Sequence, residues 1–178
     1  MTTAPLRVVM IGPVPRIYGG ISAVTGALLD AGLAERCRLT YLAEGTRQGP
    51  LRKLSHATQA LTRLLSALLR RQADVLHLHV GSGSSFYRHM LYTALGKWAR
   101  VPVILHWHLP GSGDAADAGL SGDRQRRLAR WGLHAATRVL VLSPAWANTL
   151  TQLAGNPQAA AKMVVLPNPV DCRALYPP

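Results

Sequence analysis

The sequence predicts an α/β fold in which about six parallel strands form one doubly wound sheet, with helices on both faces. Short runs of Val, Leu and Ile alternate with longer segments that have helical periodicity. The strand segments are almost continuously apolar, which is typical of parallel strands buried on both faces. The chain has 178 residues and is 48% apolar, enough to form one hydrophobic core.

The predicted elements follow one another in a regular order. The strand segments are residues 7–11, 39–43, 74–80, 102–107, 138–142 and 163–166. The helical segments are residues 21–33, 51–72, 86–98 and 124–135, and a last helix that Ser143 caps and Gly155 ends. Right-handed crossovers then give, most simply, the strand order 3-2-1-4-5-6, with the first strand beside the fourth.

In a parallel sheet, all the loops after the strands meet at one edge. Here these loops contain glycine, serine, histidine and asparagine, and they lie at residues 12–20, 81–85, 108–113, Ser143 and 167–168. Open α/β sheets bind their ligands at this edge. We therefore expect the functional site there.

The first loop ends in Gly19-Gly20, directly before a predicted helix. Glycines allow the backbone amides to approach an oxyanion, and the start of the helix faces the same place, so a diphosphate is a suitable ligand. The spacing is neither G-x-G-x-x-G nor that of a P-loop, and a Gly-Gly pair can also serve only to turn the chain. Arg16 in this loop could contact a phosphate or be an ordinary exposed arginine.

Histidines occur in two H-x-H pairs, His77 with His79 and His106 with His108. Each pair shares one face of its strand, and His79 and His108 stand at strand ends, where we expect them to face the site. A metal-dependent hydrolase is one interpretation of such pairs, but the predicted site lacks the usual carboxylate, except in the loop after His108. Hydrogen-bonded packing is the other interpretation, and we expect no metal.

The chain is strongly basic, with a net charge of +12. On the helix at residues 51–72, three arginines gather opposite four leucines: Arg52, Arg63 and Arg70 against Leu54, Leu61, Leu65 and Leu68. Such a helix can lie on an anionic membrane, or it can be an ordinary outer helix. A phosphorylated substrate and an acidic partner domain are further explanations of the charge, whereas nucleic acid is disfavoured because no recognition motif is present.

The sequence also suggests a cellular location. It has no apolar run of membrane-spanning length and no secretory signal at its start. Cys37 and Cys172 form no disulfide framework. We expect a cytoplasmic protein, either free or peripheral at the inner face of the membrane.

Five segments, in order, resemble one enzyme family: "GGIS", "DVLHLH", "PVILHWH", "TRVLVLS" and "KMVVLPNPVD". Together they resemble the amino-terminal domain of retaining GT-B glycosyltransferases of family 4. The resemblance implies a Rossmann-like domain at residues 1–166, the start of an interdomain linker at 167–178, and a donor-binding domain that is absent. It implies a nucleotide-sugar donor, held mostly by that second domain, an acceptor that is a glycan or a lipid-linked sugar, and no cofactor.

The resemblance also assigns roles to individual residues. Gly19 and Gly20 match the glycine loop that lies against the donor diphosphate and the acceptor. His108 matches a histidine that reaches the transferred sugar and is the catalytic candidate. The acceptor-side and hinge candidates are His79, Gly81, Ser82 and Gly83 for the acceptor, and Asn168 and Asp171 for the hinge, where Pro169 replaces a usual glycine.

The resemblance has a gap at the leaving group. The family's second domain carries two glutamates eight positions apart, and a basic pair that neutralises the diphosphate. The glutamates here are Glu35 and Glu44, nine apart and outside the predicted site. Because electrostatic stabilisation is usually the largest catalytic contribution, we expect the isolated chain to be inactive. A non-catalytic binding module and a subunit of a split glycosyltransferase are the alternatives.

Overall fold

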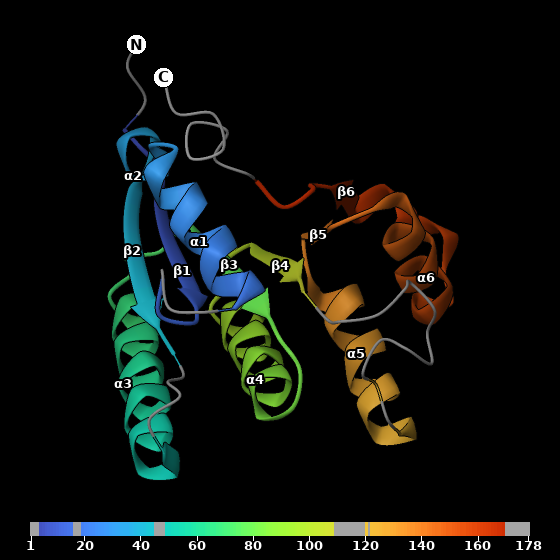
Figure 1. Cartoon of the computed structure of the whole chain (residues 1–178), viewed down its shortest axis with the longest axis horizontal. Helices are drawn as coiled ribbons and strands as arrows, with labels where there is room; N and C mark the ends of the chain where they lie inside the picture. The colour runs from blue at the N-terminus through green and yellow to red at the C-terminus, as the bar shows by residue number, and fades with distance from the viewer. Residues whose placement is uncertain (1–3, 16–18, 45–48, 109–119, 121, 170–178) are drawn as a thin grey trace.

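A computed structural model describes residues 4–15, 19–44, 49–108, 120 and 122–169 of the chain. Its centre is a six-stranded sheet in which every neighbouring pair is parallel, as predicted (Figure 1). The strands are β1 (Arg7–Gly12), β2 (Arg38–Ala43), β3 (Val75–Val80), β4 (Val103–Trp107), β5 (Arg138–Val141) and β6 (Met163–Val165).

Helices cover both faces of the sheet, which confirms the predicted α/β class. The helices are α1 (Gly20–Asp30), α2 (Leu33–Arg36), α3 (Gly49–Leu69), α4 (Ser84–Trp98), α5 (Asp123–Ala135), α6 (Pro144–Ala154) and the 3-10 helix η1 (Pro157–Lys162). One large core joins Val9 and Ile11 of β1 to residues of α3, α4, α5 and α6. Met10 and Val24 are also buried but lie outside this core, so α1 covers the opposite face. Figure 1 shows α3, α4 and α5 in a row along one side of the sheet.

The predicted strand order is wrong in one respect. The order is β2-β1-β3-β4-β5-β6, so β3 lies beside β1 and separates it from β4. β3 is almost wholly buried, whereas β2 is half-exposed, as suits an edge strand. The pairing of β1 with β3 is reinforced by Arg7, whose guanidinium and backbone N–H donate to Asp74 at 2.6–3.0 Å. These bonds from Arg7 lower the pKa of Asp74 to about 2.

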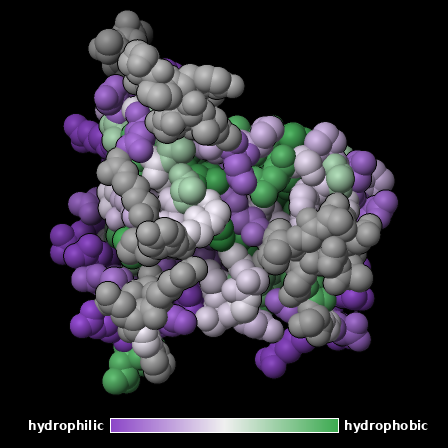
Figure 2. Space-filling model, in the orientation of Figure 1, coloured by the Kyte–Doolittle hydropathy of each residue, from purple (hydrophilic) through white to green (hydrophobic). Residues whose placement is uncertain are grey.

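α3 is longer than the strands of the sheet. Its 21 residues span about 31 Å, against about 20 Å for a six-residue strand. Leu64 and Leu68 pack in the core. Leu54 was expected on the same side of the helix as Leu68, but it is 65% exposed. The first turns of α3 therefore extend beyond the sheet. Figure 2 shows hydrophilic residues along the left flank of the molecule and a hydrophobic group at its lower tip.

The parallel arrangement places the predicted loops at one edge. The Gly19-Gly20 turn follows β1, the Gly81 loop follows β3, and His108 follows β4. Gly20 and His108 thus lie at the same edge of the sheet, as predicted, although β3 stands between their strands. None of the helices described by the structure is long and apolar enough to cross a bilayer.

Candidate functional site at the carboxyl edge of the sheet

The glycine turn before α1 is open to an incoming ligand. Gly19 has a φ of 137°, which strongly favours glycine. A Cβ atom added at Gly19 or Gly20 would meet nothing within 4 Å among the described residues. The hydroxyl of the buried Ser22 donates to the carbonyl of Val14 and so fixes the loop against the helix. The turn is therefore exposed at Gly19 and Gly20 and is held in place by Ser22.

The loop after β3 lies against this same turn. A Cβ atom at Gly81 would be 3.3 Å from the side chain of Ile21 in α1 and 3.6 Å from the Ser85 hydroxyl in α4. Ser82 and Gly83 are exposed, and Gly83 begins α4 with a φ of 63°. The structure thus brings the predicted phosphate and acceptor loops together.

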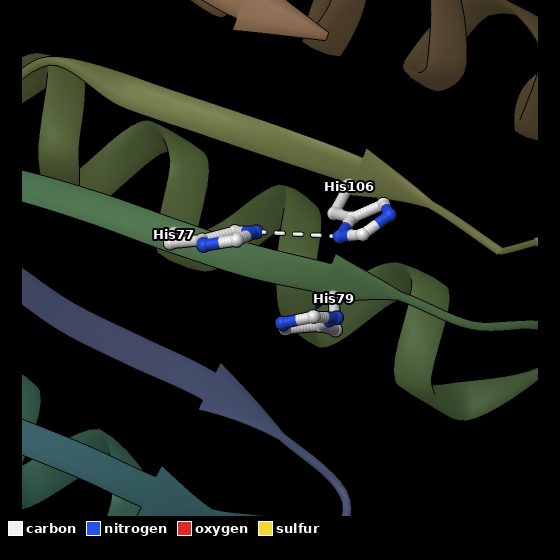
Figure 3. Close-up of side chains that lie close together, drawn as sticks. All are labelled: His77, His79 and His106. Atoms are coloured by element: carbon white, nitrogen blue, oxygen red, sulfur yellow. Dashed lines mark hydrogen bonds between the residues drawn. The ribbon is translucent and has the colours of Figure 1, made fainter. Parts of the chain in front are cut away.

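Four histidines form a compact array on the face of the sheet that carries α1. His77 Nε2 is 3.4 Å from His106 Nδ1, and His79 Nδ1 is 3.0 Å from His108 Nε2. The two rings of each pair are nearly parallel and meet end to end, with centroids 5.5 Å and 5.2 Å apart. The pairs also lie over each other, with His106 and His108 centroids 4.0 Å apart. We call these four residues the histidine array; Figure 3 shows three of them.

The histidine array is electrically neutral near pH 7. Burial lowers the pKa of His77 to about 4. Burial, with His77 and His89 nearby, lowers the pKa of His108 to about 4 as well. The pKa values of His79 and His106 are lowered further, again by burial first and then by neighbouring histidines. His79 is only 1% exposed, so contrary to expectation it does not face the site, whereas His108 is half-buried at the edge.

Hydrogen bonding between the rings accounts for the geometry of the histidine array without a metal ion. Donor atoms of His77, His79 and His106 do lie within 4.8 Å of one another. The nitrogens of each pair lie 3.0–3.4 Å apart, a distance at which an N–H···N hydrogen bond joins the two rings without an ion.

Glu44 is a site residue that the sequence analysis missed. It follows β2, is 3% exposed, and accepts hydrogen bonds from Arg88 Nε at 3.1 Å and Tyr92 Oη at 2.9 Å. The Ser85 hydroxyl donates to it at 3.2 Å, and its own N–H donates to the carbonyl of Gly12. Glu44 therefore fastens the start of α4, and with it the acceptor loop, to β1. Its only signal in the sequence is a lone carboxylate after an edge strand.

Ser85, His89 and Glu44 do not form a hydrolytic triad. The hydroxyl of Ser85 and the carboxylate of Glu44 both lie near Nδ1 of His89, at 3.2 Å and 3.4 Å. A triad needs the nucleophile and the carboxylate on opposite nitrogens of the imidazole. Nε2 of His89 is buried and has no hydrogen-bond partner among the described residues. This cluster is consequently structural.

The remaining predicted residues are separate from this group. Asn168 is exposed and lies just beyond the last sheet bond, which Leu166 N–H donates to Val141 O. Arg16 and Asp171 fall outside the described residues. The structure thus assembles Gly19, Gly20, Gly81 and His108 at one edge.

Comparison with known protein families identifies the family of this chain. Residues 8–169 match the model of the glycosyl transferase 4-like domain. The chain belongs to this family. The resemblance to the amino-terminal domain of a GT-B glycosyltransferase is thereby confirmed. The search of curated proteins found no match to the sequence of this chain.

Solved structures support the same fold. A UDP-N-acetylglucosamine 2-epimerase aligns at 11% identity with a TM-score of 0.55, over 92% of this chain and 48% of its own. The UDP-N-acetylglucosamine 2-epimerase from Rickettsia bellii aligns at 8% identity with a TM-score of 0.57, over 92% of this chain and 45% of its own. A putative UDP-N-acetylglucosamine 2-epimerase from Listeria monocytogenes aligns at 10% identity with a TM-score of 0.53, over 90% of this chain and 44% of its own. At these identities the likeness concerns the fold alone, and the chain spans about half the length of each structure.

Proposed function

We propose that this domain is the acceptor-side part of a retaining glycosyltransferase that takes a sugar from a nucleotide-sugar donor. The observation that carries the proposal is the meeting of the open Gly19-Gly20 turn, the Gly81 loop and His108 at one sheet edge, in a member of the glycosyl transferase 4-like family. The likeness to enzymes named for a UDP-sugar gives further support for a nucleotide-sugar ligand.

In this mechanism the glycine turn binds the donor diphosphate. The amides of the first turn of α1 donate to phosphate oxygens, and the missing side chains at Gly19 and Gly20 permit the close approach. Arg16 belongs to the same loop and would add a positive charge. The nucleoside and the departing diphosphate are held mainly by a second domain outside this chain, with Asn168 and Asp171 in the connecting hinge.

His108 acts as a neutral hydrogen-bond donor to the transferred sugar. Nε2 of His79 is buried without a hydrogen-bond partner among the described residues, and a buried N–H without an acceptor is rarer than an unused acceptor. The proton of His79 is therefore best placed on Nδ1, where it donates to His108 Nε2. His108 then carries its own proton on Nδ1, where no described residue accepts it, so this N–H can donate to a sugar hydroxyl.

The acceptor binds beside the loop of Gly81, Ser82 and Gly83, which Glu44 supports from behind. The acceptor is a glycan or a lipid-linked sugar. For a lipid-linked acceptor, the exposed arginines of α3 would lie against anionic headgroups at the cytoplasmic face of the membrane.

Transfer assays with a panel of labelled nucleotide sugars test the proposal. The purified chain alone should give no transfer, because it lacks the groups that neutralise the departing diphosphate. Adding a donor-binding domain from adjoining coding sequence should restore transfer, and His108→Ala should abolish it in the reconstituted enzyme. Turnover by the 178-residue chain alone would overturn the proposal that this domain is only one part of the enzyme. Full activity of the reconstituted His108→Ala variant would overturn the site.

A further inference from the structure

A groove lined by none of the candidate site residues runs between α4 and α5. It has a volume of about 540 Å³ and is lined by Tyr87, Arg124, Arg127, Leu128 and Trp131. We call these five residues the α4–α5 groove. The two helices pack closely against each other, since a Cβ atom at Gly132 in α5 would be 2.5 Å from Met90 Sδ in α4. The volume is within the range of small-molecule sites, about 300–1,000 Å³.

Aromatic side chains form the walls of the α4–α5 groove. Tyr87 is 47% exposed and Trp131 is 37% exposed, so each side chain is partly covered and partly open. Leu128 packs against the core. Partly covered aromatic rings offer flat apolar contact, and with few rotatable bonds they lose little entropy on binding. The apolar C–H faces of sugar rings are a good match for such surfaces.

The charge around the α4–α5 groove is strongly positive. α4 and α5 together carry six basic residues and one acidic residue: Arg88, Lys97, Arg124, Arg126, Arg127 and Arg130 against Asp123. Arg124 and Arg127 make no ion pair or hydrogen bond with the described part of the chain. Unpaired guanidinium groups bind carboxylates and phosphates, often through two parallel hydrogen bonds.

The α4–α5 groove begins next to the candidate acceptor loop. Gly83 is the N-cap of α4, and Tyr87 follows one turn later. α5 runs back along the sheet and ends at its amino edge, where Thr137 N–H donates to Val103 O. Since 13 helical residues span about 20 Å, Arg124 at the other end of α5 lies near the carboxyl edge. A ligand extending from the acceptor loop can therefore continue into the groove.

We propose that the α4–α5 groove binds an anionic oligosaccharide, as an extension of the acceptor site. Trp131 and Tyr87 stack on sugar rings, and Arg124 and Arg127 pair with carboxylate or phosphate groups on the chain. This inference rests on the proposed function in one respect: the bound oligosaccharide is the acceptor. It narrows the acceptor class from glycans in general to glycans that carry negative charge.

The observations favour a glycan over a membrane surface as the occupant. Membrane docking uses apolar side chains that project past their polar neighbours into the lipid. Here most of Trp131 and half of Tyr87 are covered by the domain, and both rings line a concavity. Side chains arranged in this way surround a narrow ligand better than they insert into a bilayer.

Calorimetric titration of the purified chain at low salt tests the inference directly. The probes are hexagalacturonate, the neutral maltohexaose, and vesicles of phosphatidylglycerol. Hexagalacturonate should bind, and the other two should not. Arg124→Ala, Arg127→Ala and Trp131→Ala should each weaken binding by about tenfold or more, the loss of roughly one charge-assisted bond or aromatic contact. Arg126→Ala is the matched control, because it removes the same charge from α5 outside the groove and should change affinity by less than about twofold.

Two outcomes would overturn the inference. Equal losses for Arg126→Ala and Arg124→Ala would show attraction to net charge alone. Binding of vesicles but not of hexagalacturonate would assign the surface to a membrane. If Trp131→Ala fails to fold by circular dichroism, Tyr87→Ala takes its place. Because no donor sugar is present, this binding test is independent of the transfer assay: groove binding can succeed while transfer fails, and the reverse.

Discussion

His79 Nδ1 lies 3.0 Å from His108 Nε2, and this contact joins a fully buried imidazole to the one at the ligand edge. Both rings are neutral, so only one proton is shared between the two nitrogens. The position of that proton determines whether His108 offers an N–H or a lone pair to a ligand. A residue that touches no ligand can therefore set the chemistry of the one that does.

Replacing His79 tests this control of the tautomer. His79→Asn keeps an N–H donor near the Nδ1 position and should retain most of the activity of the reconstituted enzyme. His79→Leu removes the donor and should lower kcat by about tenfold, as the loss of a supporting hydrogen bond often does. Nitrogen-15 chemical shifts of the His108 ring should report Nδ1–H in the wild type and a mixture in His79→Leu. Equal activities with unchanged shifts would contradict the assigned role.

Acidification should destabilise the domain through the histidine array. The pKa values of His77 and His108 are about 4 in the folded chain, against 6.5 for an unperturbed histidine. Between these values the unfolded state binds more protons, so the free energy of unfolding falls as the pH falls. The loss is roughly 2 kcal/mol for each of these two residues at pH 5. Urea unfolding at pH 7, 6 and 5 measures it, and a constant free energy over this range would contradict the burial of neutral imidazoles.

Removing the Glu44 carboxylate should be costly. Glu44→Ala removes the acceptor of the buried Tyr92 hydroxyl and the ion-pair partner of the half-buried Arg88, which should cost about 3 kcal/mol. Glu35→Ala removes the same charge from an exposed position on α2 and should cost less than about 0.5 kcal/mol. The urea midpoints of the two variants provide the comparison. Similar small losses in both would mean that Glu44 does not hold α4 in place.

The glycines should separate stability from function. Gly20→Leu should leave the unfolding free energy within about 0.5 kcal/mol, because a Cβ there meets no described atom within 4 Å. It should nevertheless block transfer by the reconstituted enzyme, since the side chain occupies the space of the diphosphate. Gly96→Ala should behave in the opposite way. Its Cβ would be 2.7 Å from Leu76 and from Val103, an overpacking that costs about 1–3 kcal/mol, far from the site.

Elemental analysis tests the hydrogen-bonded interpretation of the histidine array. Purified protein should contain no stoichiometric zinc, iron or manganese, and a chelator should leave its melting temperature unchanged. About one metal ion per chain, lost on replacing His77 or His106, would instead support the hydrolase alternative.

The fold was predictable from the sequence because its signals are local. Each buried strand is a short apolar run, and the Ser143-Pro144 start of α6 is confirmed, with Ser143 Oγ accepting from the N–H of Trp146. The order of the strands is not local information. The place of β3 beside β1 brings together residues that are far apart in the chain, such as Arg7 and Asp74, which are 67 residues apart. Only the polar pattern of β2 indicated that β2, rather than β3, would form the edge.

The candidate site was predictable to the same extent. Gly20 and His108 follow from the rule that parallel strands end at one edge, so their shared location needed no knowledge of contacts. Glu44 and the burial of His79 could not be inferred, because they depend on α1 and α4 packing around the strand ends. The reach of α3 past the sheet, which exposes Leu54, likewise depends on relative lengths.

The position of Glu44 also bears on how the sheet opens. Its partners Ser85 and Tyr92 come 41 and 48 residues later in the chain, so β2 is fastened at one end to a helix packed beyond its neighbouring strand. An edge strand ordinarily frays first, and amide hydrogen exchange reveals this as fast exchange along its length. In this domain the amides near Ala43 should exchange more slowly than those near Arg38. The sheet should therefore open from its amino edge, and the ligand edge should stay closed longest.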